Sequence, residues 1–384
     1  MSQVLKLGIA GLGNAGQAVL RDFSAAPGVA LGAVADVRTE ALDSLRSKHP
    51  AVEIFDSVET MCKSAAIDAV WIATPNEFHA EHVVAAAMNG KHVVCEKPMA
   101  LSLAECDRMN EAAAANKIRL LMHSKAGDPP IVKMREVVAS GRLGRTIQIN
   151  SWNYKGWLKN SRLPSEVDTA KGGGVVYRQG AHQVDVVRRV GGGMVKSVRA
   201  ATGRWHPRFD TEGNYTAFLE FADGTPATLV FNGYGRFDVT DLTWGIGEGG
   251  YASSRSPARS APQGPVNASD KYAEPARAET RGHEGARKQP FFGLTLVSCE
   301  NGDLRQSPDG LYLYTDKGRE EIACPPFLDR AAELGRLHEA VTQNRPVLTD
   351  GRWGKATLEV LLAILQSSKE RREIALSHQV PSAP

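Results

Sequence analysis

The first third of the chain alternates short, nearly continuous apolar runs with longer stretches that have helical periodicity. The apolar runs are residues 5–11, 29–36, 69–74, 92–97 and 119–124. The helical stretches between them are residues 17–26, 40–48, 80–89 and 103–116. Apolar strands that alternate with helices are typical of a parallel sheet covered on both faces. The pattern therefore predicts an α/β domain over residues 1–124.

From about residue 145 the pattern changes to longer strands in which apolar and polar residues alternate. These strands are residues 146–154, 195–205, 215–221, 227–235, 294–300, 303–308 and 310–316. Such alternation suits a sheet with only one face on the core, and it predicts a second domain over residues 125–327. Residues 328–343 and 353–367 then have the pattern of amphipathic helices.

Residues 251–290 interrupt this second pattern. They are rich in Ser, Ala, Pro, Arg and Glu and contain no Leu, Ile, Phe or Met. Such a segment cannot bury enough apolar surface to offset the entropy of ordering its chain. We therefore predict a flexible surface insert here, either a passive loop or a lid over the site.

The composition narrows the class of protein. A chain of 384 residues with 42% hydrophobic residues favours two domains, and its net charge of +3 without a Lys/Arg run indicates no nucleic-acid partner. The five cysteines contain no CxxC pair, which favours reduced thiols over a disulfide or zinc framework. No cleavable signal is seen, and no apolar window approaches the roughly 18 residues of a membrane span. We expect a cytoplasmic protein without a membrane partner.

The first predicted strand runs directly into the glycine motif of residues 11–16, GLGNAG. In such a motif Gly11 allows a tight turn, Gly13 lets the backbone approach a pyrophosphate, and Gly16 lets the helix pack closely. Asp36 follows about twenty residues later, at the end of the second predicted strand. Strand, motif, helix and acid together predict that a nicotinamide dinucleotide binds at the helix N-terminus.

Asp36 and Arg38 bear on which dinucleotide binds. A carboxylate at position 36 can accept hydrogen bonds from both ribose hydroxyls and would repel a 2′-phosphate, which favours NAD over NADP. Arg38 leaves the choice open, because a nearby arginine can hold that phosphate, stack on the adenine or simply be solvated.

Two further motifs, TPNEFH (74–79) and EKP (96–98), fall at the carboxyl ends of predicted strands, where ligands bind in open α/β folds. The residues that we expect to bind the dinucleotide are Gly11, Leu12, Gly13, Asn14, Ala15, Asp36, Arg38, Thr74, Pro75, Asn76, His79, Glu96 and Lys97. His79 and His82 have no third ligand at a suitable spacing, so no metal is expected.

The motif set GLGNAG, TPNEFH, EKP and GGG…H…D resembles the glucose–fructose oxidoreductase / inositol dehydrogenase (Gfo/Idh/MocA) family. The resemblance implies a Rossmann domain completed by C-terminal helices at about 328–370. It also implies an α+β domain whose open, mostly antiparallel sheet supports the substrate site and forms a homodimer or homotetramer. By the same resemblance, Lys97 and His182 are the catalytic pair beside the nicotinamide.

Arg178 departs from the family pattern. Sugar- and inositol-oxidising members usually carry an aspartate four residues before the histidine, where this chain has Arg178. Because guanidinium prefers planar carboxylates, this change predicts an anionic substrate. The alternative is that Arg178 pairs with a neighbouring acid. Tyr154, Arg162 and Asp185 complete the residues expected to bind the substrate.

Tracts of the C-terminal half, including RQGAHQVDVVR and AATGRWHP, resemble the phthalate cis-dihydrodiol dehydrogenase branch of this family. The resemblance implies NAD-dependent oxidation of a ring cis-diol that carries carboxylates. Three alternatives remain open: a sugar or inositol dehydrogenase, a dinucleotide-sensing regulator without turnover, and a redox-assisted hydrolase or lyase.

Overall fold

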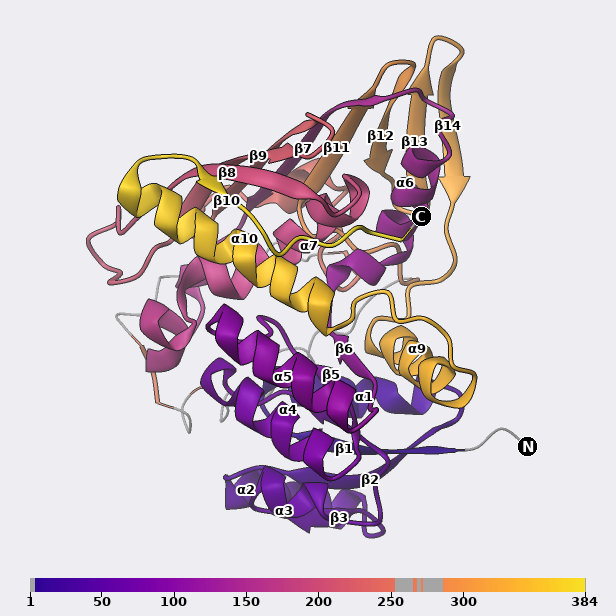
Figure 1. Ribbon diagram of the computed structural model, residues 1–384, viewed down its shortest axis with the longest axis vertical. Coiled ribbons are helices and arrows are strands. Elements are labelled where there is room, and N and C mark those ends of the chain that lie inside the picture. Colours follow the sequence, from indigo (N-terminus) through magenta and orange to yellow (C-terminus); the bar gives the residue numbers. More distant parts are fainter. Residues whose placement is uncertain (1–3, 253–264, 268–270, 272–285, 384) are drawn as a thin grey trace. The chain divides into compact units, whose positions relative to one another are not determined.

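The computed structural model describes residues 4–252, 265–267, 271 and 286–383, and the chain divides into two compact units (Figure 1). The first unit comprises Met1–Ser124 and Leu328–Leu358, and the second comprises Lys125–Phe327 and Glu359–Pro384. Helix α10 (Gly351–Glu370) belongs to both, so its residues from 359 onward differ from the sequence-based assignment to the first domain. Most of the predicted insert at 251–290 lies outside the described residues.

The first unit contains a six-stranded parallel sheet with the order β3-β2-β1-β4-β5-β6. The strands are β1 (Leu5–Ala10), β2 (Val29–Ala35), β3 (Glu53–Phe55), β4 (Ala69–Ile72), β5 (His92–Cys95) and β6 (Leu120–Met122). This order and the parallel pairing are those of a Rossmann fold, which confirms the predicted fold class. The three-residue β3 was not predicted.

Helices cover both faces of this sheet. They are α1 (Asn14–Asp22), α2 (Thr39–Lys48), α3 (Val58–Cys62), α4 (His79–Met88), α5 (Leu103–Ala115) and α9 (Arg330–Thr342). Right-handed crossovers place α1 and α2 on one face, where α9 packs against α1 and β2, while α3, α4 and α5 pack in sequence on the other face. Helix α5 begins with a capping box between Ser102 and Glu105.

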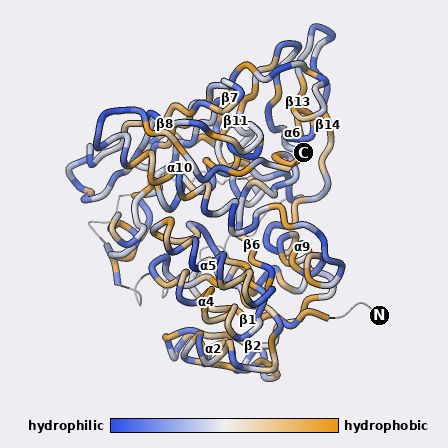
Figure 2. Tube along the Cα trace, viewed as in Figure 1, coloured by the Kyte–Doolittle hydropathy of each residue, from blue (hydrophilic) through white to orange (hydrophobic). Residues whose placement is uncertain are grey.

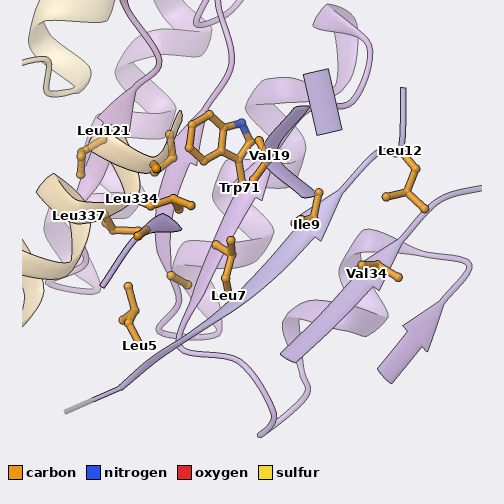
Figure 3. Close-up of a cluster of buried hydrophobic side chains, with 14 of the residues drawn as sticks. Leu5, Leu7, Ile9, Leu12, Val19, Val34, Trp71, Leu121, Leu334 and Leu337 are labelled. Carbon is orange, nitrogen blue, oxygen red and sulfur yellow. The ribbon is translucent and has the colours of Figure 1, made fainter. Parts of the chain in front are cut away.

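A continuous hydrophobic cluster joins the sheet of the first unit to helices that are distant in sequence. Figure 3 shows Leu7 and Trp71 on the central strands β1 and β4 beside Leu334 and Leu337 of α9. All four side chains are fully buried. Truncating one such leucine to alanine costs about 2–5 kcal/mol, so α9 is an integral part of this unit although it follows β6 by some two hundred residues.

The second unit is built on a nine-stranded sheet with the order β14-β13-β12-β11-β7-β10-β9-β8-β15. The strands are β7 (Thr146–Tyr154), β8 (Val195–Thr202), β9 (Asn214–Phe221), β10 (Pro226–Asn232), β11 (Leu294–Cys299), β12 (Gly302–Gln306), β13 (Gly310–Thr315), β14 (Gly318–Ala323) and β15 (Ile374–Ala375). Only β7 and β10 pair in parallel among these described strands. The predicted α+β class with an open, mostly antiparallel sheet is confirmed.

Buried residues alternate with more exposed ones along β9 and β10, so the two faces of this sheet differ in burial. Figure 2 colours the chain by the hydropathy of each residue. One face packs against α6 (Pro129–Ala139) and α7 (Ala181–Val190). There Gln183 of α7 donates to the Ser151 carbonyl at 2.8 Å and accepts from the Tyr215 hydroxyl at 2.5 Å. The opposite face exposes Trp152 and Phe218.

All five cysteines are free thiols, as predicted. No helix in the described part of the chain is both long and apolar enough to cross a membrane.

Candidate active site

The glycine motif forms a tight loop between β1 and α1 in the first unit. Gly11 has φ +88°, and a Cβ there would lie 2.7 Å from the Ala73 carbonyl oxygen. A Cβ on Gly16 would lie 1.8 Å from the carbonyl oxygen of Gly11, so no larger residue fits. Helix α1 starts at Asn14, three residues earlier than predicted, with no acidic residue in its first turn. Its N-terminus therefore suits a phosphate group.

Asp36 lies just after β2 and faces this loop. Its carboxylate accepts from the Leu12 N–H at 2.6 Å and from two side-chain nitrogens of Arg38, each at 2.9 Å. Burial alone would raise the pKa of Asp36, but the bonds from Arg38 and Leu12 hold the pKa below its usual value. Arg38 is thus held on the carboxylate, and the acid is ionised where the adenosine ribose is expected.

His79 connects the two motifs at the carboxyl edge of the sheet. Its ring nitrogens contact the carbonyl oxygens of Pro98 at 2.8 Å and of Thr74 at 3.0 Å. Burial lowers the pKa of His79, while its contacts with the Pro98 and Thr74 carbonyls oppose that shift. The side chain is almost completely buried and therefore fixes the relation between the TPNEFH and EKP loops. A direct contact with the dinucleotide stays a prediction.

A buried network of charged side chains includes Glu96 of the EKP segment. Glu96 lies 3.7 Å from Arg330 of α9, and His123 hydrogen-bonds Glu333 of the same helix. Burial would raise the pKa of Glu96, but the charges of His123 and Arg330 hold the pKa below its usual value. The Glu96 carboxylate thus interacts with α9, while the adjacent Lys97 is half-buried. Its catalytic role is not tested by this geometry.

His182 in the second unit stands at the start of α7, directly after a π-helical turn over Val176–Gly180. Such wide turns are frequent at functional sites. The His182 ring is 6% exposed and packs edge-on against Phe292, with centroids 5.1 Å apart. The ammonium of Lys155 lies 5.3 Å from the centroid of the same Phe292 ring. The His182 ring and the Lys155 ammonium therefore both pack against Phe292.

Arg178 projects from the π-helical turn and pairs with an acid. Its Nη2 lies 2.9 Å from Glu166 Oε1, which is the alternative that the sequence had left open. The other oxygen of Glu166 accepts from the Leu163 N–H at 2.8 Å and from the ammonium of Lys271. A single carboxylate is thus bound by two cationic side chains.

Arg162 adds a third cation to this group. Its guanidinium stacks on Trp157 at 4.0 Å and donates to the Trp157 carbonyl. Burial lowers the pKa of Arg162 to about 10, with Glu166 opposing the shift and Arg178 adding to it. We call Arg162, Glu166, Arg178 and Lys271 the cationic cluster.

The two remaining predicted substrate residues have other described neighbours. Tyr154, at the end of β7, packs edge-on against Phe237 with centroids 5.7 Å apart. Asp185 is buried on α7, and its negative charge opposes the burial-driven lowering of the pKa of Arg188. Neither arrangement tests a contact with substrate, so both roles stay predictions.

Four residues of this region were missed in the sequence: Lys155, Glu166, Lys271 and Phe292. Lys155 stands among the aromatic and basic residues already singled out, so composition could have found it. Glu166 and Lys271 lie 105 residues apart, and Lys271 belongs to a segment whose composition indicates a loop. No local pattern connects them.

Comparison with known proteins agrees with the fold described above. The family model described as "Oxidoreductase family, NAD-binding Rossmann fold" matches residues 5–124, and the model of the GFO/IDH/MocA C-terminal domain matches residues 131–245. The chain belongs to the Gfo/Idh/MocA family, as the motif set predicted, and is an oxidoreductase with an NAD-binding Rossmann domain.

Individual relatives show which dehydrogenases this chain is similar to. The chain is 32% identical to 1-carboxy-3-chloro-3,4-dihydroxycyclohexa-1,5-diene dehydrogenase of Comamonas testosteroni, over 95% of each chain. It is 28% identical to myo-inositol 2-dehydrogenase of Thermotoga maritima over 51% of this chain and 58% of that protein. A solved structure from Bordetella bronchiseptica RB50 is 35% identical, with a TM-score of 0.87, over 97% of this chain and all of that one. WlbA dehydrogenase of Bordetella pertussis, solved with NADH and UDP-GlcNAcA, shares the fold with a TM-score of 0.70 at 19% identity, covering 98% of this chain and 99% of that one.

Proposed function

We propose that the protein oxidises a hydroxyl of a cyclic, carboxylated diol with NAD. The observation that carries this proposal is the cationic cluster, which places Arg178 one turn before His182 and gathers three cations around Glu166. Guanidinium groups bind carboxylates through parallel hydrogen bonds. The similarity to a dehydrogenase whose name describes a carboxylated cyclohexadiene diol supports the same substrate class.

The first unit fits a dinucleotide. The space at Gly11 and Gly16 admits only backbone, and the start of α1 suits the pyrophosphate. Asp36 would bind the adenosine ribose and repel a 2′-phosphate, which favours NAD over NADP. A bound nicotinamide would supply the acceptor for the hydride that leaves the carbinol carbon of the substrate.

The chain's own residues then have three tasks. Lys97 hydrogen-bonds the reacting hydroxyl and stabilises the negative charge that develops on its oxygen. His182 accepts the proton, either directly or through Lys97. Arg178 binds the ring carboxylate and so selects the substrate. For a dihydrodiol, enolisation of the ketone restores an aromatic ring and draws the reaction forward.

A substrate panel with NAD, followed by NADH absorbance, tests this proposal. Carboxylated ring dihydrodiols are expected to be oxidised far faster than inositols or aldoses. Preferential oxidation of an inositol or aldose would overturn the substrate class in favour of the sugar and inositol alternative. Binding of NADH without turnover of any compound would favour a regulator, and product release without net NADH would favour a redox-assisted hydrolase or lyase.

We also propose that a second copy of the chain covers the open face of the second-unit sheet. This face exposes Trp152 on β7 and Phe218 on β9, two large apolar side chains on the side opposite α7. Light scattering after gel filtration should show a homodimer or homotetramer, and Trp152→Glu with Phe218→Glu should yield monomers. A wild-type monomer at micromolar concentration would contradict this assembly.

A further inference from the structure

His82 has no part in the mechanism so far, although it stands three residues after His79 on the same face of α4. His79 Nε2 lies 3.0 Å from the Thr74 carbonyl oxygen, and His82 Nδ1 lies 2.9 Å from the Thr74 hydroxyl oxygen. We propose that Glu59, His82 and Thr74 form a hydrogen-bond relay that presents the Thr74 hydroxyl as an acceptor to the nicotinamide half of the dinucleotide. NAD and NADP share that half, so the relay depends neither on the choice between them nor on the substrate.

Thr74 lies where the order of the parallel strands reverses. It follows β4, which neighbours β1, and a Cβ on Gly11 would lie 3.0 Å from the Thr74 backbone nitrogen. A dinucleotide binds across such a reversal. Asp36, expected beside the adenosine ribose, follows β2 on the other side of β1. The half-buried Thr74 is therefore on the side expected for the nicotinamide half.

Neighbouring side chains fix the His82 ring and favour one position of its proton. Phe78 stacks on the ring, with centroids 5.9 Å apart, and the Glu59 carboxylate lies 3.7 Å from Nε2. The Ser57 hydroxyl donates to Glu59 Oε2 at 2.7 Å and holds the pKa of this acid below its usual value. An ionised acid beside Nε2 favours a proton on that nitrogen, which leaves Nδ1 to accept from the Thr74 hydroxyl.

The protonation state of His82 sets the direction of the relay. When the Thr74 hydroxyl donates to Nδ1, its lone pairs remain to accept from a ribose hydroxyl or the carboxamide of the ligand. A protonated ring donates from Nδ1 instead, and the Thr74 proton then opposes a donor on the ligand. Dinucleotide affinity should therefore fall as His82 gains its second proton.

The charges around His82 determine where this happens. Burial lowers the pKa of His82, and the charges of Glu59 on α3 and Glu81 on α4 oppose that shift. Lys63, at the end of α3, acts on Glu59, and His82 itself adds to the lowering of the pKa of His79. A pKa below the ordinary 6.5 leaves the neutral ring in the majority at pH 8, so the loss of affinity belongs to the acid side of 6.5.

Calorimetry of NAD binding to the full-length protein, from pH 8 to pH 5, tests the relay without turnover. Wild-type affinity should fall about three- to tenfold, as for one hydrogen bond between neutral groups. His82→Phe keeps a ring but has no nitrogen, and Thr74→Val has no hydroxyl, so both should show this loss already at pH 8. His82→Asn keeps an acceptor near Nδ1 that does not titrate, and it should keep the affinity of the wild type at pH 8 down to pH 5.

Two controls accompany these variants. ADP, which lacks the nicotinamide half, should bind every variant as it binds the wild type at pH 8. The matched substitution is His92→Asn, at the opposite end of the strands, where Nδ1 accepts from the Arg119 N–H and burial also lowers the pKa of the ring. It should leave the pH dependence of NAD binding unchanged.

The outcomes separate the relay from the proposed function. A decline with falling pH that persists in His82→Asn, or NAD affinity at pH 8 that is unchanged in both His82→Phe and Thr74→Val, would overturn the relay. Equal losses of NAD and ADP would show a general distortion of the glycine loop and would overturn it too, as would loss of the decline in His92→Asn. Preferential oxidation of an inositol would refute the proposed substrate class and leave the relay intact.

Discussion

The dinucleotide edge of the first unit and the cationic cluster of the second are built in different ways. At the dinucleotide edge the backbone determines what fits. Gly11 and Gly16 leave no room for a side chain, and the N-terminus of α1 favours a negatively charged ligand. The cluster uses side-chain charge, and two of its members, Glu166 and Lys271, lie 105 residues apart. A site of the first kind suits a ligand shared by many enzymes, whereas a site of the second kind can change with the substrate.

The largest expected effect falls on Lys97, the lysine proposed to bond the reacting hydroxyl. Lys97→Met should lower kcat about 10²-fold or more, the contribution of one acid–base or electrostatic group. NADH affinity, measured by fluorescence titration, should stay close to that of the wild type. A kcat near the wild-type value would show that Lys97 does not act on the reacting hydroxyl.

Substituting Arg178 tests the role of side-chain charge in the cationic cluster. Arg178→Ala should raise KM for a carboxylated diol about 10- to 150-fold, because it removes a charge-assisted bond of about 1.5–3 kcal/mol. NAD affinity and the kinetics with an uncarboxylated diol should hardly change. Arg178→Lys keeps the charge without the paired donors and should recover part of the loss. If both diols lose activity equally, Arg178 only holds Glu166 in place.

Substituting Asp36 tests the choice of dinucleotide at the edge of the first unit. Asp36→Ser removes the carboxylate expected to accept from the ribose hydroxyls. It also releases Arg38, which in the wild type donates to this carboxylate through two side-chain nitrogens. The ratio of kcat/KM for NAD to that for NADP should fall about tenfold or more. Wild-type protein that binds NADP more tightly than NAD would contradict the role given to this acid.

The last prediction concerns the free energy of unfolding rather than activity, at the buried charges beside the EKP segment. Burial would lower the pKa of His123, but Glu96 and Glu333 raise it above its ordinary value of 6.5. The charged ring therefore stabilises the fold fully below that value, and its contribution is lost as pH rises through the raised pKa. His123→Asn should cost about 1.5–3 kcal/mol in urea unfolding at pH 6 and progressively less at alkaline pH. A cost that does not vary with pH would mean that the ring is neutral.

The fold was largely predictable because its strands carry strong patterns. Nearly continuous apolar residues marked five of the six parallel strands, and only the three-residue β3 escaped. In the second unit β14 was missed because Arg319, Glu320 and Glu321 give it no apolar signal. Charged residues on an edge strand suppress unwanted pairing, and the same property hides the strand from pattern analysis.

The candidate site was predictable only where its residues lie within short motifs. The glycine loop, Asp36 and EKP could be recognised because each works over a few neighbouring positions. Arg178 was found, but its partner Glu166 was not, since an acid twelve residues away has no periodic relation to it. The pairing of Lys271 with Glu166 depends on tertiary structure alone.

The π-helical turn over Val176–Gly180 has an evolutionary consequence. Each residue of an α-helix rotates the chain by roughly 100°, and a wide turn accommodates one residue more than a regular one. Deleting a single codon between Arg178 and Gly180 would restore a regular turn and shift the positions of the side chains within it relative to His182. A different residue would then occupy the direction of Arg178. With the role proposed for Arg178, one insertion or deletion in this turn would change substrate preference and leave the histidine and the rest of its helix intact.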